Sequence, residues 1–363
     1  VAIIVLACAA SLGKRFFGKK ADACGGCNRC GSCISGCPQG AKNSLDLNYL
    51  YLARQLGVQV FSETRVSHIS RQGAGYRVHL RGRTHALRSL DAPQLILAAG
   101  VLGSLEILFA SRDRYRTLPH LPAALGEHVR TNSEAIVAIR GQPGVDISQG
   151  TTISSHFHAD AQTHITQNRF PRSYNFMRLY MGPLVDDTRP LRRAAKVVGA
   201  LLRRPWHWLG HWFTADWYRR ISVLTVMQQA DNQLAFGYRR RVWRLGAFAL
   251  ESRLSVGAAS PTYLPQANRA ARAFAEASGG EALNVLPESL GNRAVTAHLL
   301  GGAVIAGSPA EGVVDARHQV FGHPGLYVID GSSIPANVGV NPSLTIAALA
   351  ERAISLWPVR LAD

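Results

Sequence analysis

The side chains best suited to catalysis lie near the C-terminal end of the chain. His298 is followed closely by Gly301 and Gly302, and Asn341 stands just before an expected helix. An imidazole titrates near neutral pH, so it can take the proton of an alcohol while a hydride leaves its carbon. The glycines let a backbone or cofactor approach closely, and an asparagine can donate a hydrogen bond to the alcohol oxygen. These residues indicate a redox site; a core histidine and a turn asparagine are the structural alternative.

A second group able to do chemistry is a run of cysteines. Five of the six cysteines lie between residues 24 and 37, too densely for ordinary disulfide geometry. Cys27, Cys30, Cys33 and Cys37, with Pro38 after them, follow the spacing of a bacterial [4Fe–4S] ligand run. No second run accompanies them, so reduced or structural thiols are the alternative. Unpaired thiols favour a reducing compartment.

Two further groups have both a functional and a structural interpretation. His156, His158 and His164 lie in a polar, strand-like stretch, where they could bind a metal ion, although polar sheet residues are the commoner case. The segment from Leu191 to Tyr218 combines arginines with tryptophans. It predicts either an amphipathic element on a membrane surface or helices packed into a core with a solvated basic face. The sequence does not separate these two interpretations.

Local patterns predict the elements that would hold the C-terminal residues. A short apolar strand over residues 326–329 leads into Asp330 and Gly331, and a Gly- and Pro-containing loop precedes a helix that begins at Ser343. A turn followed by a helix N-terminus favours an anionic or electron-rich ligand. Earlier, a buried strand over 94–98, a turn at Gly100 and a helix through 109 predict a nucleotide-contacting crossover of a doubly wound sheet.

Three other stretches have clear periodicity. Residues 44–56 repeat apolar side chains at helical spacing, and residues 58–61 alternate as a strand. Residues 221–227 and 233–238 predict two strands joined as a hairpin across Asp231 and Asn232.

Composition limits the remaining choices. The chain has 363 residues, 47% of them apolar, and a formal net charge of +17. It is long enough for two cores, and its charge favours an anionic neighbour such as a membrane surface. No nucleic-acid-binding signature accompanies the arginines. The apolar stretch at residues 1–12 is too short to span a bilayer. We therefore expect a cytoplasmic protein, with peripheral membrane contact as an extension.

Several motifs resemble the glucose–methanol–choline (GMC) family of flavin oxidoreductases, and within it the cholesterol-oxidase-like branch. The matching stretches cover most of the chain in order: residues 27–52, 95–108, 129–134, 296–305, 312–314 and 325–353. The resemblance implies FAD as cofactor and His298 and Asn341 as catalytic residues. It also implies that cofactor-binding residues are Val66 near the adenine, Gly100, Asp330 and Gly331 at the phosphate–ribityl region, Pro342 at the pyrimidine end, and Ser343 at the start of a helix directed at the isoalloxazine.

The sequence departs from this family in two places. No GxGxxG motif occurs in the chain, so we expect a member that lacks the N-terminal part of the family's FAD site. The strand expected to carry a catalytic glutamate, over residues 164–168, has no carboxylate. Glu134 and Glu288 are candidates without an assigned place.

These observations predict an α/β protein with an incomplete, doubly wound FAD-binding domain and an antiparallel-sheet substrate domain. The expected divisions are an N-terminal and cysteine-rich segment (1–40), the FAD-binding domain in two parts (41–130 and 296–363), and the substrate domain (131–295). The expected function is oxidation of a secondary, sterol-like alcohol by hydride transfer to FAD, with His298 as base. The alternatives are an iron–sulfur electron-transfer module through Cys27–Cys37 and an inactive, truncated homologue.

Overall fold

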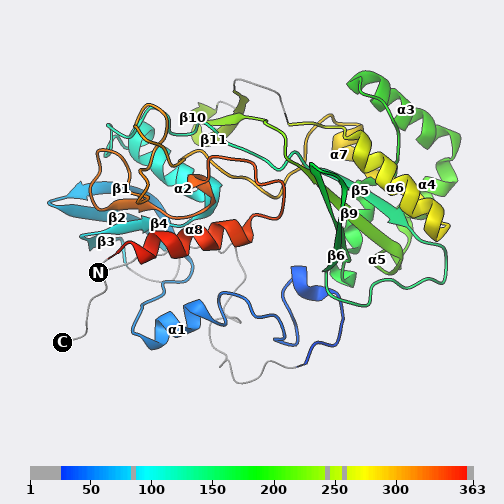
Figure 1. Cartoon of the computed structure of the whole chain (residues 1–363), viewed down its shortest axis with the longest axis horizontal. Helices are drawn as coiled ribbons and strands as arrows, with labels where there is room; N and C mark the ends of the chain where they lie inside the picture. Colours follow the sequence, from blue (N-terminus) through cyan, green and yellow to red (C-terminus); the bar gives the residue numbers. More distant parts are fainter. Residues whose placement is uncertain (1–25, 83–86, 242–245, 256–259, 358–363) are drawn as a thin grey trace.

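The computed structural model describes residues 26–82, 87–241, 246–255 and 260–357, so most of the expected N-terminal segment lies outside the described residues. Figure 1 shows two lobes of different construction, with helix α8 crossing the first lobe toward the second. The chain passes between the lobes more than once: residues 64–109, 234–254 and 326–355 belong to the first lobe, and residues 135–228 and 265–289 belong to the second.

The first lobe joins segments that are far apart in the sequence. Strand β4 (Leu95–Leu97) pairs in parallel with β13 (Leu326–Val328), so that Leu95 lies opposite Leu326. Both strands are short apolar runs with almost no solvent exposure, as expected for parallel strands covered on both faces. Helix α2 (Gly100–Phe109) follows β4, and α8 (Ser343–Ser355) follows the loop after β13.

The rest of this lobe is antiparallel. Strands β1 (Thr64–Gln72), β2 (Gly75–Gly82) and β3 (Ser89–Ala92) form a meander, and β10 (Leu234–Arg241) pairs with β11 (Ala247–Leu254). One hydrophobic core joins the meander, the parallel pair and α2. Short helical segments complete the lobe: α1 (Tyr49–Gln55), the π-helical turn η2 (Ala110–Arg114) and η5 (Gly331–Ser333).

The second lobe is organised around a six-stranded antiparallel sheet, within the described residues. Its order is β6-β7-β9-β5-β12-β8, with β5 at Ala135–Arg140, β6 at Ile153–Asp160, β7 at Thr163–Asn168, β8 at Met181–Pro183, β9 at Ile221–Gln228 and β12 at Glu281–Val285.

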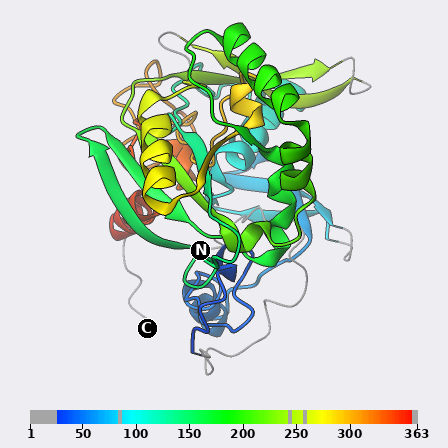
Figure 2. The same cartoon turned by 90° about the vertical axis from the view of Figure 1, so that its right-hand side faces the viewer.

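Helices cover both faces of this sheet. Alternate residues of β5 point to opposite faces: Val137 packs against α6 (Pro265–Ser278), and Ala138 packs in the cluster that contains Trp208 and Trp217. That second cluster is built by three helices, namely α3 (Pro190–Arg203), α4 (Pro205–Phe213) and α5 (Trp217–Arg220). Figure 2, which looks onto this lobe, shows α6 and the α3–α4 pair on different sides of the strands. The remaining helical segments are η1 (Ser32–Ile34), η3 (Arg172–Tyr180) and α7 (Leu286–Ser289).

The predicted hairpin is wrong. Both strands exist, but β9 pairs with β5 and β7 in the six-stranded sheet, whereas β10 pairs with β11. The physical reason is burial: most of β9 is buried, so it lies in the sheet interior with a neighbour on each side. The predicted strand at 58–61 is not formed.

The predicted helix over 44–56 is shorter than expected. It begins at Tyr49, where the Asn48 side chain accepts the Tyr49 amide hydrogen at 2.5 Å. The side chains that gave it helical periodicity, such as Leu52 and Leu56, are exposed.

The basic and aromatic segment from Leu191 to Tyr218 has both buried and exposed aromatic side chains. Trp208 and Trp217 are buried in the core, and the Trp212 indole donates to the Met181 carbonyl at 3.0 Å. Trp206 and Phe213, by contrast, are about 80% exposed. Among the described residues, no helix is both long and apolar enough to cross a bilayer.

Candidate active site

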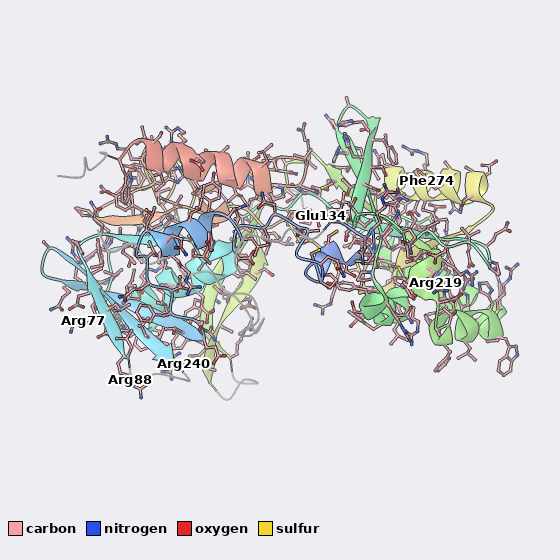
Figure 3. All side chains as sticks on the ribbon, turned by 90° about the horizontal axis from the view of Figure 1, so that it is seen from below. Arg77, Arg88, Glu134, Arg219, Arg240 and Phe274 are labelled. Carbon is pink, nitrogen blue, oxygen red and sulfur yellow. The ribbon has the colours of Figure 1, made fainter. Side chains whose placement is uncertain are left out.

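His298 and Glu134 form a buried pair between the two lobes. The His298 Nδ1 atom is hydrogen-bonded to Glu134 Oε1, and Glu134 Oε2 accepts the Ala297 amide hydrogen at 2.9 Å. The Glu134 side chain is 1% exposed and the imidazole 18% exposed. Figure 3 shows Glu134 at the junction of the lobes. A buried carboxylate at one ring nitrogen fixes the orientation of the imidazole and leaves its other nitrogen available for a substrate.

The loop that carries Glu134 is held from several sides. The Arg130 amide donates to the Leu300 carbonyl at 2.7 Å, which places the loop beside the chain after His298. Residues 131–134 are all nearly inaccessible to solvent, and Thr131 and Ser133 are hydrogen-bonded to the Asn232 side chain. Glu134 directly precedes β5, which begins at Ala135, so the place of β5 in the six-stranded sheet fixes the position of Glu134.

Glu288 is a second buried carboxyl group close to this pair. Its Oε1 atom accepts the Ile136 amide hydrogen at 3.3 Å, and Oε2 has no hydrogen-bond partner. The pKa of Glu288 is raised to about 8, chiefly by burial and to a smaller extent by the nearby Glu134, against the opposing effects of that amide and Arg193. Glu288 is therefore a protonated acid at neutral pH.

Asn341 lies at the start of α8, and the same loop fixes its position. The Asn132 side chain donates to the Val340 carbonyl at 2.7 Å. The Asn341 Oδ1 atom is buried without a partner. Pro342 occupies the position before the helix, and no side chain caps the first turn, which begins at Ser343. The helix therefore presents unpaired N–H groups and the positive end of its dipole.

The other predicted cofactor residues gather at the parallel strand pair. The Ser104 hydroxyl on α2 donates to Asp330 Oδ2 at 2.5 Å, and the Ser332 amide donates to Oδ1 at 2.8 Å. Gly331 packs against Ile346 of α8. Gly100 has a φ of +70° and open space where a Cβ would lie, so a ligand can approach its backbone.

Val66 is separate from this row of residues. Its side chain is buried in the core of the first lobe, at an irregularity in the pairing of β1 with β2. Only its backbone could therefore contact a ligand.

These features fit a flavin dinucleotide. The open backbone at Gly100, the uncapped start of α8 and the orphaned Asn341 oxygen lie along elements that the parallel pair brings together. Asp330 already accepts hydrogen bonds from serines, yet a carboxylate has lone pairs for a further donor.

A cavity of about 490 Å³ lies in the same region of the molecule. Its lining includes Thr131 and Thr296 together with Leu234, Leu254 and Pro261, but neither His298 nor Glu134. Thr296 links the cavity to the backbone of the pair, because its hydroxyl accepts the His298 amide hydrogen at 3.1 Å. The volume is within the range of small-molecule sites.

The predicted metal sites are not supported by the structure. Cys27, Cys30, Cys33 and Cys37 are free, and in the described part of the chain no group of three or more metal-binding side chains lies close enough to hold an ion. The backbone around Gly31 bonds instead to residues 150 and 152, so the cysteine loop is fixed by ordinary hydrogen bonds.

The three histidines are polar residues of two neighbouring strands, as in the commoner of the two interpretations. His156 and His158 lie on β6, whereas His164 lies on the neighbouring strand β7. Their ring centroids are 5.0–6.4 Å apart, and the His164 Nε2 atom approaches His156 Nδ1 at 3.3 Å. They are not among any group of side chains in the described residues that could hold a metal ion.

Sequence reasoning named Glu134 and Glu288 without placing them and missed Asn132. Glu134 and His298 are 164 residues apart, so no local pattern links them. The available signal was the polar run from Arg130 to Glu134 just before an apolar strand, because polar residues in such a place need partners if they are buried.

The fold is that of a known oxidase. A solved structure, described as the crystal structure of pyridoxine 4-oxidase from Mesorbium loti, matches with a TM-score of 0.57 over 86% of this chain and 61% of that one. The sequences are only 14% identical, so this likeness concerns the fold.

The sequence assigns the family. Two models described as GMC oxidoreductase match residues 3–112 and 186–350. A cholesterol oxidase of Mycobacterium tuberculosis is 39% identical over 94% of this chain, and one of Acinetobacter baumannii is 36% identical over 93%. The chain spans 61–62% of the length of these relatives. It belongs to the GMC oxidoreductase family.

Proposed function

We propose that this chain serves the oxidation of a secondary alcohol, with His298 as the base and FAD as the hydride acceptor. The observation that carries the proposal is the buried hydrogen bond between His298 Nδ1 and Glu134. With Nδ1–H donating to the carboxylate, Nε2 offers a lone pair to the alcohol proton. Glu134 then balances the positive charge that the ring acquires. FAD, when bound, supplies the acceptor for the hydride.

The remaining site residues have roles in the same proposal. Asn341 would direct the alcohol oxygen toward the imidazole. Gly100, Asp330 and Gly331, with the backbone at Val66, would hold the cofactor, and Pro342 and Ser343 would bring the positive end of α8 to its ring. The pairing of β4 with β13 supports residues 41–130 and 296–363 as the FAD-contacting unit. The six-stranded sheet supports residues 131–295 as the substrate-binding unit only in part, because β10 and β11 within that range pack in the core of the first lobe.

A sterol-like substrate is part of the proposal. The relatives named cholesterol oxidase support it. The cavity whose lining includes Leu234, Leu254 and Pro261 also supports it, because this lining offers apolar surface together with the hydroxyl groups of Thr131 and Thr296.

The test separates cofactor binding from chemistry. FAD is titrated into the purified chain and followed by flavin fluorescence, and cholesterol in detergent is then added without oxygen while the visible flavin band is recorded. The wild type should bind FAD and lose the band. His298→Gln should bind FAD equally and reduce it about 10²- to 10⁴-fold more slowly, and Glu134→Gln should show a smaller loss.

Asp330→Asn is the matched variant for cofactor binding and should weaken FAD uptake. A His298→Gln chain that reduces flavin at the wild-type rate would refute the role of the base. A folded wild-type chain that takes up no FAD would refute the proposal for this chain and favour the inactive homologue.

We further propose peripheral contact between α3–α4 and an anionic membrane. Leu202, Trp206 and Phe213 are 74–82% exposed, and Arg203 and Arg204 are exposed beside them. Exposed aromatic residues next to arginines suit a lipid headgroup layer. Vesicles with and without phosphatidylserine should co-sediment the wild type in proportion to the anionic lipid, and Trp206→Ala with Phe213→Ala should abolish this. Equal sedimentation of that double variant would refute the contact.

A further inference from the structure

A column of stacked rings lies on the first lobe, where β1, β2 and η2 meet. The rings of His79 and His68 are 4.0 Å apart and nearly parallel, and the ring of Tyr115 stacks on His68 at 3.8 Å. The Tyr115 hydroxyl accepts a hydrogen bond from Arg81 at 3.1 Å. The column therefore holds a guanidinium group at its tyrosine end.

Two more arginines extend this arrangement onto the β10–β11 pair. The Arg114 guanidinium carbon is 5.0 Å from the centroid of the Tyr115 ring and 5.8 Å from that of Phe248. The Arg240 guanidinium carbon is 5.3 Å from the same Phe248 centroid. Arg81, Arg114 and Arg240, which we call the arginine triad, therefore surround two rings: Arg114 lies over both, Arg240 lies over Phe248, and Arg81 is hydrogen-bonded to the Tyr115 hydroxyl. All three are exposed, and Figure 3 shows Arg240 on the same lobe as Arg77 and Arg88.

The carboxylates near the triad are already paired with other arginines. These ion pairs are Arg65–Glu106, Arg77–Asp91, Arg112–Asp113 and Arg241–Glu251. Within the described residues, no carboxylate forms an ion pair with a member of the triad, so its positive charge is not neutralised internally.

The positive charges of the triad affect the pKa of a neighbouring histidine, His68. The pKa of His68 is lowered to about 4, first by burial and then by the positive charges of His79, Arg81 and Arg114. No negatively charged group opposes this shift among the causes that act on His68. The imidazole is therefore neutral at physiological pH, chiefly because it is buried, and the nearby positive charges add to this effect.

We infer that the arginine triad is a binding site for a phosphoryl group, a function independent of the proposed alcohol oxidation. Guanidinium forks donate paired hydrogen bonds to phosphate oxygens, and several such forks suit an anion with several oxygens. The rings beneath hold the guanidinium planes in place, so less side-chain freedom is lost on binding. The phosphoryl group belongs either to a free phosphate compound or to a lipid headgroup.

The first experiment measures binding of inorganic pyrophosphate to the whole chain by calorimetry at low ionic strength. Arg114→Gln and Arg240→Gln should each weaken binding about tenfold, because each removes one charge-assisted contact. The matched control is Arg77→Gln, an exposed arginine of the same lobe that Asp91 already holds through two contacts of 2.7 Å. It should change the affinity less than twofold.

A second measurement uses His68 itself. Bound pyrophosphate should offset the charges of Arg81 and Arg114, and the pKa of His68, followed by NMR of its ring, should rise toward its ordinary value. Arg77→Gln should preserve this rise, and Arg114→Gln should reduce it. A purely structural role for the triad would leave the pKa of His68 insensitive to pyrophosphate.

Vesicles distinguish the two sources of the phosphoryl group. Retention on phosphatidic acid vesicles that the triad variants lose, and that pyrophosphate blocks, assigns a lipid headgroup; pyrophosphate binding without such retention assigns a free phosphate compound. The inference is overturned if the wild type binds neither pyrophosphate nor the vesicles, or if Arg77→Gln weakens binding as much as Arg114→Gln.

Discussion

Glu288 offers a direct test of the electrostatics beside His298. Its side chain is buried, and its pKa is raised from 4.5 to about 8, chiefly by burial. Replacement by glutamine keeps an oxygen that can accept the Ile136 amide hydrogen but removes the ionisation. We predict that Glu288→Gln changes how the stability of the protein depends on pH.

The sign and size follow from proton linkage. Between pH 4.5 and 8 the folded protein keeps the Glu288 proton while the unfolded chain has released it, so the free energy of unfolding falls as pH rises. At about 1.4 kcal/mol for each pH unit, the loss between pH 4.5 and 7 is roughly 3 kcal/mol. Glu288→Gln removes this pH dependence. Between pH 4.5 and 7, the free energy of unfolding of the variant should therefore rise by about 3 kcal/mol relative to that of the wild type.

The assay is urea unfolding followed by tryptophan fluorescence at several pH values, because Trp208 and Trp217 lie in the core of the same lobe. Glu276→Gln, an exposed carboxylate on α6, is the control and should follow the wild type at every pH. Parallel curves for Glu288→Gln and the wild type between pH 4.5 and 7 would refute the assignment of Glu288 as a protonated acid.

Three other substitutions test a backbone conformation, a buried histidine and the packing of the core. Gly301→Ala should destabilise the fold by about 2 kcal/mol or more, measured by urea unfolding, because φ is +83° and the new Cβ would meet the His128 carbonyl. The pKa of His211 is lowered to about 4 by burial, so stability should fall by roughly 3 kcal/mol as pH drops from 6.5 to 4; His211→Gln should lack this component in acid titrations. Trp208→Ala should cost about 3–5 kcal/mol in thermal or urea unfolding, whereas exposed Trp206→Ala should cost under about 0.5.

The sequence predicted those parts of the fold that local patterns determine. The strand at β13, the turn at Asp330 and the helix from Ser343 each have their own signal: an apolar run, turn glycines, and a proline before a helical repeat. The strand β9 was also predicted, but its partners were not, because pairing depends on which residues become buried from both sides. Likewise, the apolar periodicity of residues 44–56 predicted a helix, but the helix begins only at Tyr49 and the apolar side chains that gave the periodicity are exposed.

The candidate site shows why sequence reasoning could name its carboxylate, Glu134, but could not place it. Residues 130–134 connect to the second half of the site at three points: Arg130 to Leu300, Asn132 to Val340, and Glu134 to His298. The same stretch continues directly into β5, whose register is fixed by neighbours on both sides. Side chains alternate along a strand, so a shift of one residue in β5 would turn Glu134 away from the imidazole. The orientation of His298 therefore depends on the pairing of the six-stranded sheet in the other lobe.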